Sequence, residues 1–435
     1  MKKIKTWFKI SYLFPALLFS GPGAFHLAAQ DTITLDFCYQ QILKTYPLTR
    51  QAGLMDKSSD LRIKNLNKNY LPSINVNVQA TWQNQVPEVV IDLPSGLPPI
   101  QGPVVPNDQY KLTLDINESI YDGNVTHYQK NLEKFNLNVD KKNVDASLYV
   151  LKDQINQYFF SILLTQENIK LLQETSKQLH SKMAEVESAV KNGTVLKMNA
   201  DLIQAEIIKV DQNIYELSMD RVASIHMLSE LISLPLGENS AFRVPVISLP
   251  GFTYENKRIE NELYGIQIER VNLMKNMVTT KWNPRLYAFT QLGIGKPGLN
   301  FLSNEFAPTF LVGAKVTWNP WNWNANKNEK KMYDIQGDIL KNQQESFDKN
   351  IRVSTQKNIA DIKKLSDLIL KDRELIDLRT SITKTASAQL TNGVITSSDY
   401  ILRVNDETQA KMGMEIHKIQ LIKAKITYLY NTGKL

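Results

Sequence analysis

The longest regular pattern in the chain is an apolar seam that runs through residues 148–190 in steps of three and four. Eleven of its thirteen positions are Leu, Ile, Val, Met or Tyr, and the other two are Thr165 and Ser176. A repeat that averages 3.5 residues predicts coiled-coil packing with a left-handed supercoil. The helical pattern covers 126–190, so at about 1.5 Å per residue the helix measures roughly 100 Å, far more than one globular domain accommodates.

A second long helical pattern covers 327–390, and each of the two patterns stops at an Asn-Gly pair. Glycine readily adopts the positive φ angle that ends a helix, so both breaks predict the tip of an antiparallel helical hairpin. The first hairpin is expected over about 124–232 with its tip at 192–194, and the second over about 324–430 with its tip at 391–395. The tip residues are Asn192, Gly193, Thr194, Asn392, Gly393 and Val394.

Four segments alternate apolar and polar residues with the period of two that places one set of side chains on each face of a sheet. They cover about 73–83, 109–120, 285–295 and 308–318, of which 285–295 is the least regular. Consecutive segments are expected to pair as two hairpins. The first pair is joined by residues 84–107, which contain six prolines and predict a long exposed loop.

The order of helix, strand pair and long helical hairpin occurs twice, first in 31–235 and again in 257–435. Residues 236–256 contain Pro and Gly and are interpreted as a linker. An aromatic turn follows each strand pair, at Tyr121 in the first copy and at Trp321 in the second, 200 positions apart. The predicted fold class is therefore mainly α with a small β part, built as two tandem repeats that give four strands per chain.

Residues 1–30 have the pattern of a secretory signal peptide, with four lysines before an apolar run at 10–19 and small residues before Asp31. The apolar run is half the length that a spanning helix needs, so cleavage rather than anchoring is expected. Removal of the segment lowers the formal charge from +7 to +3, because it holds four lysines and no acidic residue. This charge is too small to imply nucleic-acid binding.

The sole cysteine, Cys38, is expected to be a small buried residue that forms no intrachain disulfide.

Four amphipathic strands create a constraint, because open sheet edges do not occur in lipid and four strands are too few to close a barrel. Three chains would supply twelve strands, within the range of outer-membrane barrels, with the apolar faces toward lipid. Aromatic residues near the strand ends are candidates for an interfacial belt: Trp82, Tyr110, Tyr121, Trp318, Trp321 and Trp323. A soluble sheet packed on one face would show the same alternation and remains the alternative.

In this arrangement the chain resembles the TolC-like outer-membrane efflux proteins, which form the outer membrane factor family. The resemblance rests on the doubled order of elements, on Leu71-Pro72 and Asn283-Pro284 before strands, on Tyr121-Asp122-Gly123 after a strand, and on the two tips. It implies a homotrimer with a twelve-stranded β-barrel in the outer membrane of a Gram-negative bacterium and a twelve-helix α-barrel in the periplasm. It also implies a passive exit duct for efflux or type I secretion, whose tips meet a periplasmic adaptor, or membrane fusion protein, of an inner-membrane transporter.

The resemblance further implies a pore constriction near the tips, where family members often carry carboxylates six and nine positions after the second tip Gly. In this chain those positions are Asp399 and Leu402, and the position six after the first tip Gly is Asn199. Leu390 and Ile395 stand where the best-known member has the Tyr and Arg of a closing lock. Three copies of Asp399 would favour cations, whereas an exposed carboxylate in the first turn of a helix is the structural alternative.

Other classes of protein fit the sequence less well than a channel. Gly293, Gly295 and Gly298 match a dinucleotide-binding spacing, but Pro297 and the following sequence deny them a helix N-terminus. The histidines beyond residue 30 lie far apart without metal-ligand spacing, so no enzyme, cofactor or metal site is expected. A secreted coiled-coil scaffold without a pore is the second alternative, and the transported substrate is left open.

Overall fold

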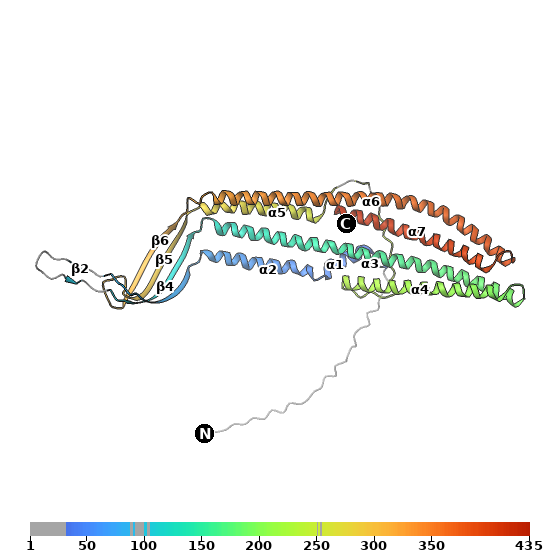
Figure 1. The fold of residues 1–435 in the computed structure, drawn as a ribbon, viewed down its shortest axis with the longest axis horizontal. Helices are drawn as coiled ribbons and strands as arrows, with labels where there is room; N and C mark the ends of the chain where they lie inside the picture. Colours follow the sequence, from blue (N-terminus) through green and yellow to red (C-terminus); the bar gives the residue numbers. More distant parts are fainter. Residues whose placement is uncertain (1–31, 88–89, 92–99, 102–104, 250, 253–254) are drawn as a thin grey trace, which may run out of the picture.

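The computed structural model describes residues 32–435 except 88–89, 92–99, 102–104, 250 and 253–254, so the expected signal peptide lies outside the described residues. The described chain is elongated, with a β-sheet at one end and long helices that run away from it (Figure 1). It forms a mainly helical fold in which each half contributes two main strands and a long helical hairpin, preceded by two shorter α-helices in the first half and by one in the second. The predicted fold class of a single chain is therefore confirmed.

Two helices of 67 residues each, α3 (Val125–Lys191) and α6 (Ala325–Thr391), run along the helical body (Figure 1). Each begins directly after an asparagine in the left-handed backbone conformation, Asn124 or Asn324, 200 residues apart. Near the sheet they are accompanied by α2 (Leu48–Asn67) and α5 (Ile259–Met277), which lead through the short 3-10 helices η1 (Lys68–Tyr70) and η2 (Val278–Trp282) into strands. Toward the far end they pack against α4 (Lys197–Ile232) and α7 (Ser397–Thr432).

The main sheet has four antiparallel strands in the order β1 (Ser73–Trp82), β4 (Asp108–Tyr121), β5 (Arg285–Lys296) and β6 (Ala307–Thr317). The pairing of β4 with β5 joins the two sequence repeats into one sheet. A separate pair of two-residue strands, β2 (Val90–Ile91) and β3 (Ile100–Gln101), lies in the loop between β1 and β4. Within the described residues, β1 and β6 are each paired on one side only, so the main sheet has two open edges.

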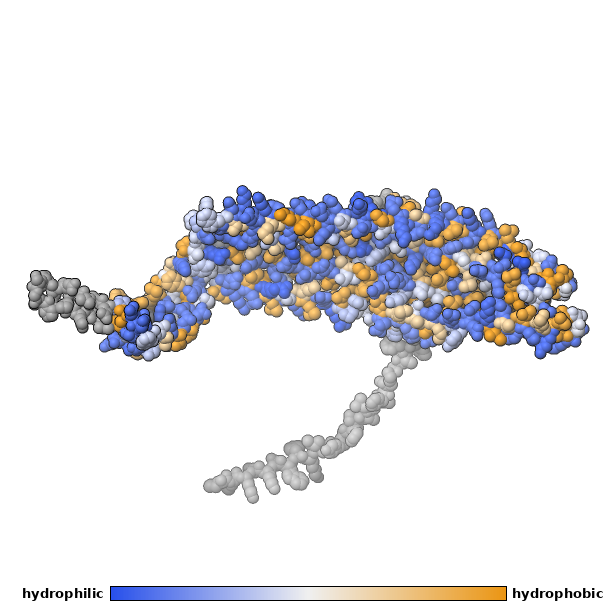
Figure 2. All heavy atoms as spheres, viewed as in Figure 1, coloured by the Kyte–Doolittle hydropathy of each residue, from blue (hydrophilic) through white to orange (hydrophobic). Residues whose placement is uncertain are grey.

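The register gathers most apolar residues of the four strands on one face of the sheet, while Phe289 and Leu311 fall on the other face. Ile74 pairs with Ile116 and Val76 with Leu114, Leu114 pairs onward with Leu292, and Leu292 pairs with Phe310. Ile74, Val76, Leu292 and Phe310 are exposed in the single chain, and Figure 2 shows orange surface over the strands beside the helical body. The opposite face carries residues such as Asn77, Thr113 and Gln291. A chain in water would leave this apolar face uncovered, so the sheet requires an apolar surrounding or a partner.

Two apolar clusters hold the helical body together. The first lies midway along the body and joins α1 (Leu35–Thr45), α3, α4 and α7, with Ile42, Ile155, Phe159 and Ile225 fully or almost fully buried. The second lies toward the tips and joins α3, α4, α6 and α7. Each predicted seam position of α3 is buried or half-buried, as the heptad pattern requires.

The segment that joins the two halves lies against the first cluster. Its described residues between α4 and α5 form no helix or strand, but Phe242 is buried and its ring packs edge-on against Phe159. The backbone N–H of Arg243 donates to the carbonyl of Ile33 at 3.0 Å. Arg221 of α4 donates to the carbonyl of Ser240 at 2.6 Å. These contacts fix the connection between the repeats to the middle of the body.

No helix in the part of the chain that the structure describes combines the length and the apolarity needed to cross a bilayer.

The burial of Cys38 gives a direct chemical test of the first cluster. Its side chain is 0% exposed, and burial raises the pKa of the thiol to about 12. Since the thiolate is the reactive form, folded protein is expected to resist alkylation by iodoacetamide at pH 8, and unfolded protein to react completely. Intact-mass spectrometry after timed quenching measures the modified fraction. Rapid labelling of folded protein would show that this part of the cluster is open.

Candidate functional site at the helical tips

The two hairpin tips have the same backbone geometry. Gly193 and Gly393 have φ angles of 71° and 75°, and no atom lies within 4 Å of a Cβ built on either glycine. The N–H of Gly193 donates to the carbonyl of Val190 at 2.9 Å, and the N–H of Thr194 to that of Ala189 at 3.0 Å. This pair of bonds is the Schellman motif, in which the left-handed residue satisfies the last carbonyls of a helix. The glycines therefore serve the turn itself rather than close packing.

The second tip repeats these bonds from Gly393 to Leu390 and from Val394 to Gln389, at 3.0 and 2.8 Å. Asn192 and Asn392 are the C-caps of α3 and α6, and both are exposed. Val394 is also exposed, as are Leu196 and Met198 beside the first tip. The free end of the body therefore presents apolar side chains that no described part of the chain covers.

Asp399 lies in the first turn of α7, where it forms a capping box with Thr396. Its carboxylate accepts the Thr396 hydroxyl at 2.7 Å and the Thr396 N–H at 3.2 Å, while the Asp399 N–H donates to the Thr396 hydroxyl at 3.2 Å. These bonds hold the pKa of Asp399 below its usual value, since they favour the charged form. The side chain stays exposed, so a capping role and a role toward solvent are compatible at this position.

Asn199 and Leu402 occupy different environments. The Asn199 amide oxygen accepts the backbone N–H of Ser397 at 3.1 Å, which ties the start of α4 to the start of α7. Leu402 is exposed on α7, three residues beyond Asp399. The structure thus brings Asn199 next to the turn that carries Asp399, and it leaves Leu402 in contact with solvent in the single chain.

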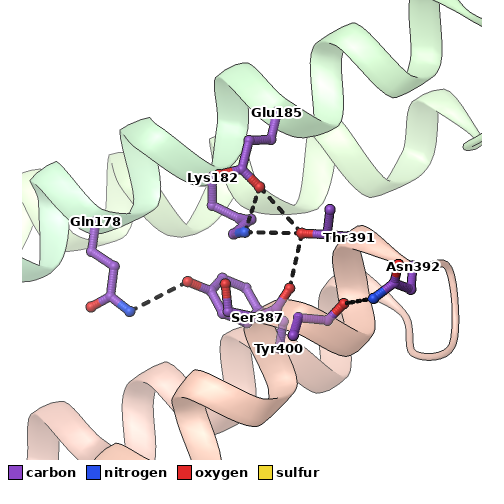
Figure 3. Close-up of polar contacts among 8 residues, drawn as sticks. Gln178, Lys182, Glu185, Ser387, Thr391, Asn392 and Tyr400 are labelled. Carbon is purple, nitrogen blue, oxygen red and sulfur yellow. Dashed lines mark hydrogen bonds and ion pairs between the residues drawn. The ribbon is translucent and has the colours of Figure 1, made fainter.

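A buried lysine links the two hairpins and was not predicted from sequence. Lys182 of α3 is 7% exposed, and its ammonium lies 2.5 Å from Glu185 Oε2 and 3.3 Å from Thr391 Oγ1 of α6 (Figure 3). The Thr391 hydroxyl is also 3.3 Å from Glu185 Oε2. The lysine ammonium lies 5.8 Å from the ring centroid of Tyr400, within the range of a cation–π contact. Lys182 therefore contacts both long hairpins near their free ends.

Apolar packing surrounds this polar contact. Tyr400 of α7 is 1% exposed and lies in the second cluster together with Leu179, Val186, Ile203 and Leu390. Burial raises the pKa of the Tyr400 hydroxyl, which accepts from Gln178 at 3.4 Å (Figure 3). Leu390 takes part through its apolar side chain. The structure thus joins the ends of the two hairpins through a buried apolar cluster.

Further contacts join the hairpins away from the tips. Thr175 of α3 and Thr408 of α7 have their hydroxyls 3.0 Å apart, and the Asn405 amide donates to Glu206 of α4 at 3.0 Å. Within the second hairpin, Arg379 of α6 forms an ion pair at 2.7 Å with Asp406 of α7. The polar links therefore continue along the hairpins, whereas Lys182 and Asn199 connect them closest to the tips.

Between the tips lies a cavity of about 320 Å³, lined by Lys182, Val186, Val195, Leu390 and Thr391 among others. Throughout the described residues, no group of three or more His, Cys, Asp or Glu side chains is placed to hold a metal ion. Gly293 and Gly295, part of the dinucleotide-like spacing, are residues of strand β5. The described residues at the tips thus form contacts between the hairpins and line this cavity.

Comparison with solved structures identifies the fold. CusC is similar with a TM-score of 0.69 and 12% identity, over 97% of this chain and 98% of that one. The outer membrane protein VceC from Vibrio cholerae is similar with a TM-score of 0.65 and 12% identity, over 92% of this chain and 96% of that one. The outer-membrane channel MtrE of Neisseria gonorrhoeae, in its open state, is similar with a TM-score of 0.65 and 14% identity, over 92% of this chain and 88% of that one.

No protein-family model matches the chain, and no curated protein matches it. The similarity to these structures covers almost the whole described chain and confirms the fold expected from the resemblance. The solved structures are of channel proteins, and at this level of identity they establish the architecture of the chain.

The contact made by Lys182 predicts how the tips are held together. Lys182→Met keeps the aliphatic stem and removes the ammonium, so the two hairpin ends are expected to separate more readily. Spin labels on cysteines placed at Asn192 and Asn392 would report this as a broader and longer distance distribution in pulsed electron-paramagnetic-resonance measurements. Lys177→Met, on the exposed side of the same helix, is the matched control and should change nothing. Identical distributions for all three proteins would refute the role of Lys182.

Proposed function

We propose that the chain is an outer-membrane exit duct of a Gram-negative bacterium that works as a homotrimer with a periplasmic adaptor and an inner-membrane pump. The observation that supports it most directly is the sheet, whose apolar face is exposed and whose two edges have no partner among the described residues of the chain. Lipid covers such a face, but it cannot satisfy the backbone groups of an open edge. The similarity to solved outer-membrane channels gives this architecture a precedent.

Closure by identical neighbours fits the strand arrangement. Edge strand β6 of one chain would pair with edge strand β1 of the next, and three chains would give a barrel of twelve strands. The apolar face would then turn outward to lipid and the polar face would line the lumen. Strand β1 has 10 residues, which agrees with the roughly 9–11 residues that a tilted β-strand needs to cross the bilayer.

The helical body, like the sheet, has an outermost element on each side that packs against only one neighbour within the chain. In the half near the sheet, α2 packs on α3, α3 on α5 and α5 on α6, which leaves α2 and α6 at the two sides. The outer helix α2 exposes Leu54 and Leu61, and this part of α6 exposes Met332, Ile335 and Ile339. These residues follow helical spacing, so they form apolar stripes on the two free sides. In a trimer, the α2 stripe of one chain would pack against the α6 stripe of its neighbour.

The half near the tips repeats this arrangement. The order is α4, α3, α7, α6, and the outer helices α4 and α6 expose two further apolar stripes. The stripe on α4 consists of Ile208, Tyr215 and Met219, and the stripe on α6 of Leu375, Leu378 and Ile382. A closed ring of three chains would bury both, so the same neighbour would be in contact from the sheet to the tips. A heterologous interface of this kind closes into a ring when its rotation permits.

The aromatic residues lie at the two ends of the apolar face. Trp82 and Tyr110 are at the end away from the helices, where the ring of Tyr110 stacks on Phe306 at 6.1 Å between centroids. Tyr121 and Trp318 are at the end beside the helices, followed by Trp321 and Trp323. All six are exposed in the single chain. Their positions support two belts, one for each interface of the outer membrane.

The tips would form the periplasmic entrance. Three copies of Asp399 would place a ring of charge near the mouth, with Asn199 tied to the same turn and Leu402 as an apolar neighbour. The contacts of Lys182 would hold the two hairpins of each chain together in the narrow state. The exposed ends, formed by Asn192, Gly193, Thr194, Asn392, Gly393 and Val394, would face the adaptor. Transport would be passive, since the pump partner would supply the energy.

Bilayer recording tests the duct and the role of Asp399 together. Purified wild-type protein is expected to give discrete conductance steps in planar bilayers, with block by divalent cations on the tip side. Asp399→Ala should weaken that block, because the ring of carboxylates attracts divalent ions. Unchanged block in a conducting mutant would remove Asp399 from the entrance, whereas the absence of any steps would contradict the duct and favour a scaffold without a pore.

The trimer contact predicts a second result. Leu378→Asp places a charge in the proposed contact between α6 and the neighbouring α4, where burial of an unpaired carboxylate is costly. The mutant trimer is therefore expected to dissociate at a lower temperature than wild type on gel electrophoresis in mild detergent. Lys384→Asp adds an aspartate at an exposed position of α6 outside the stripe and should have little effect. Equal dissociation temperatures for Leu378→Asp and wild type would place the contact elsewhere.

A further inference from the structure

The polar face of the sheet carries an uneven set of charges. Across the described strands, the basic side chains on that face are Lys111, Arg285 and Lys315, and the acidic side chain is Asp115. The register assigns them to this face, because Lys111 pairs with Gln79 and Gly295, Lys315 with Tyr287, and Arg285 with Thr317. The other acidic residues of these strands, Asp108 and Glu118, alternate onto the apolar face.

The single carboxylate is held against the wall of the sheet. Asp115 Oδ1 accepts the side-chain amide of Gln291 from β5 at 2.7 Å, and Asp115 Oδ2 accepts the side-chain amide of Asn77 from β1. The Thr113 hydroxyl also lies 3.4 Å from Oδ2. Three donors on three strands therefore fix its position and occupy its lone pairs. A carboxylate bound in this way keeps its charge but offers few free acceptor sites to a passing solute.

The three basic side chains are held less tightly, although Lys111 interacts electrostatically with Asp115, four residues along the same strand and on the same face. Lys111 and Lys315 are exposed and Arg285 is half-buried. Among the described residues, none of the three forms an ion pair with a carboxylate. Long basic side chains extend from a wall toward water, so their charges would lie farther into a lumen than that of Asp115. Rings of Lys and Arg favour anions in pores.

We infer that the inner face of the sheet favours anionic solutes, with Lys111 and Lys315 as residues that determine this preference and Asp115 as the opposing charge. This inference rests on the proposed duct, because the polar face becomes a lumen only when the barrel closes. It assigns the outer-membrane segment a charge preference opposite to that of the Asp399 ring at the tips. The chemical class that the exit segment would pass most readily is a solute with a carboxylate, phosphate or sulfate group.

The test is the zero-current potential of single pores under a gradient of KCl. In the double variant Lys111→Gln, Lys315→Gln the Cl⁻ to K⁺ permeability ratio is expected to fall at least about twofold at 0.1 M salt. Asp115→Asn is expected to raise the ratio. Both shifts should shrink near 1 M salt, since the screening length falls from about 10 Å to about 3 Å.

Glu118→Gln is the matched control, because it removes a carboxylate from the same strand three residues away but on the opposite face. It is expected to leave the ratio unchanged. If pores form and the lysine variant leaves the ratio unchanged or raises it, the inference is wrong and the duct stands. If Glu118→Gln shifts the ratio as much as Asp115→Asn, the assignment of the two faces is wrong. If no pores form, the proposed duct itself fails.

Discussion

The structure depends on a sheet that one chain cannot complete. Four antiparallel strands place most of their apolar side chains on a single face, and within the described residues β1 and β6 have open edges. In water the exposed face would drive association, and in lipid the unpaired N–H and C=O groups of the edges would each cost several kcal/mol. Identical neighbours resolve both problems when they close the sheet. The apolar stripes on the outer helices would also be buried by these neighbours, from the sheet to the tips.

Periodicity in the sequence was sufficient to predict the architecture. The heptad seam of α3, the alternation in the strands and the paired Asn-Gly breaks each reflect local geometry, and the duplication showed that the pattern was used twice. The pairing between the two hairpins could not be predicted, because alternation specifies which face of a strand is buried but not which strands are neighbours. The β4–β5 pairing that joins the repeats became visible only in the structure.

The contacts at the tips could be predicted only in part from the sequence. Lys182 precedes the seam residue Met183 and is of a type that is mostly exposed, so nothing local indicated that it is buried against Thr391 and Tyr400. Asn199 was selected through its resemblance to an acidic position, yet its bond to Ser397 depends on how two distant helices meet. Asp399 is exposed in the first turn of α7, as its structural alternative expected, but the capping box that it forms with Thr396 was not predicted. Contacts between hairpins are set by tertiary packing, which a single sequence does not encode in its spacing.

Hydrogen exchange of the two edge strands, in protein reconstituted into lipid, tests closure of the sheet most directly. If neighbours complete the barrel, the backbone amides of β1 and β6 are expected to exchange as slowly as those of the central strands β4 and β5, because all four would then be paired on both sides. Fast exchange confined to β1 and β6, beside slow exchange in β4 and β5, would mean that the edges stay open and would contradict the account.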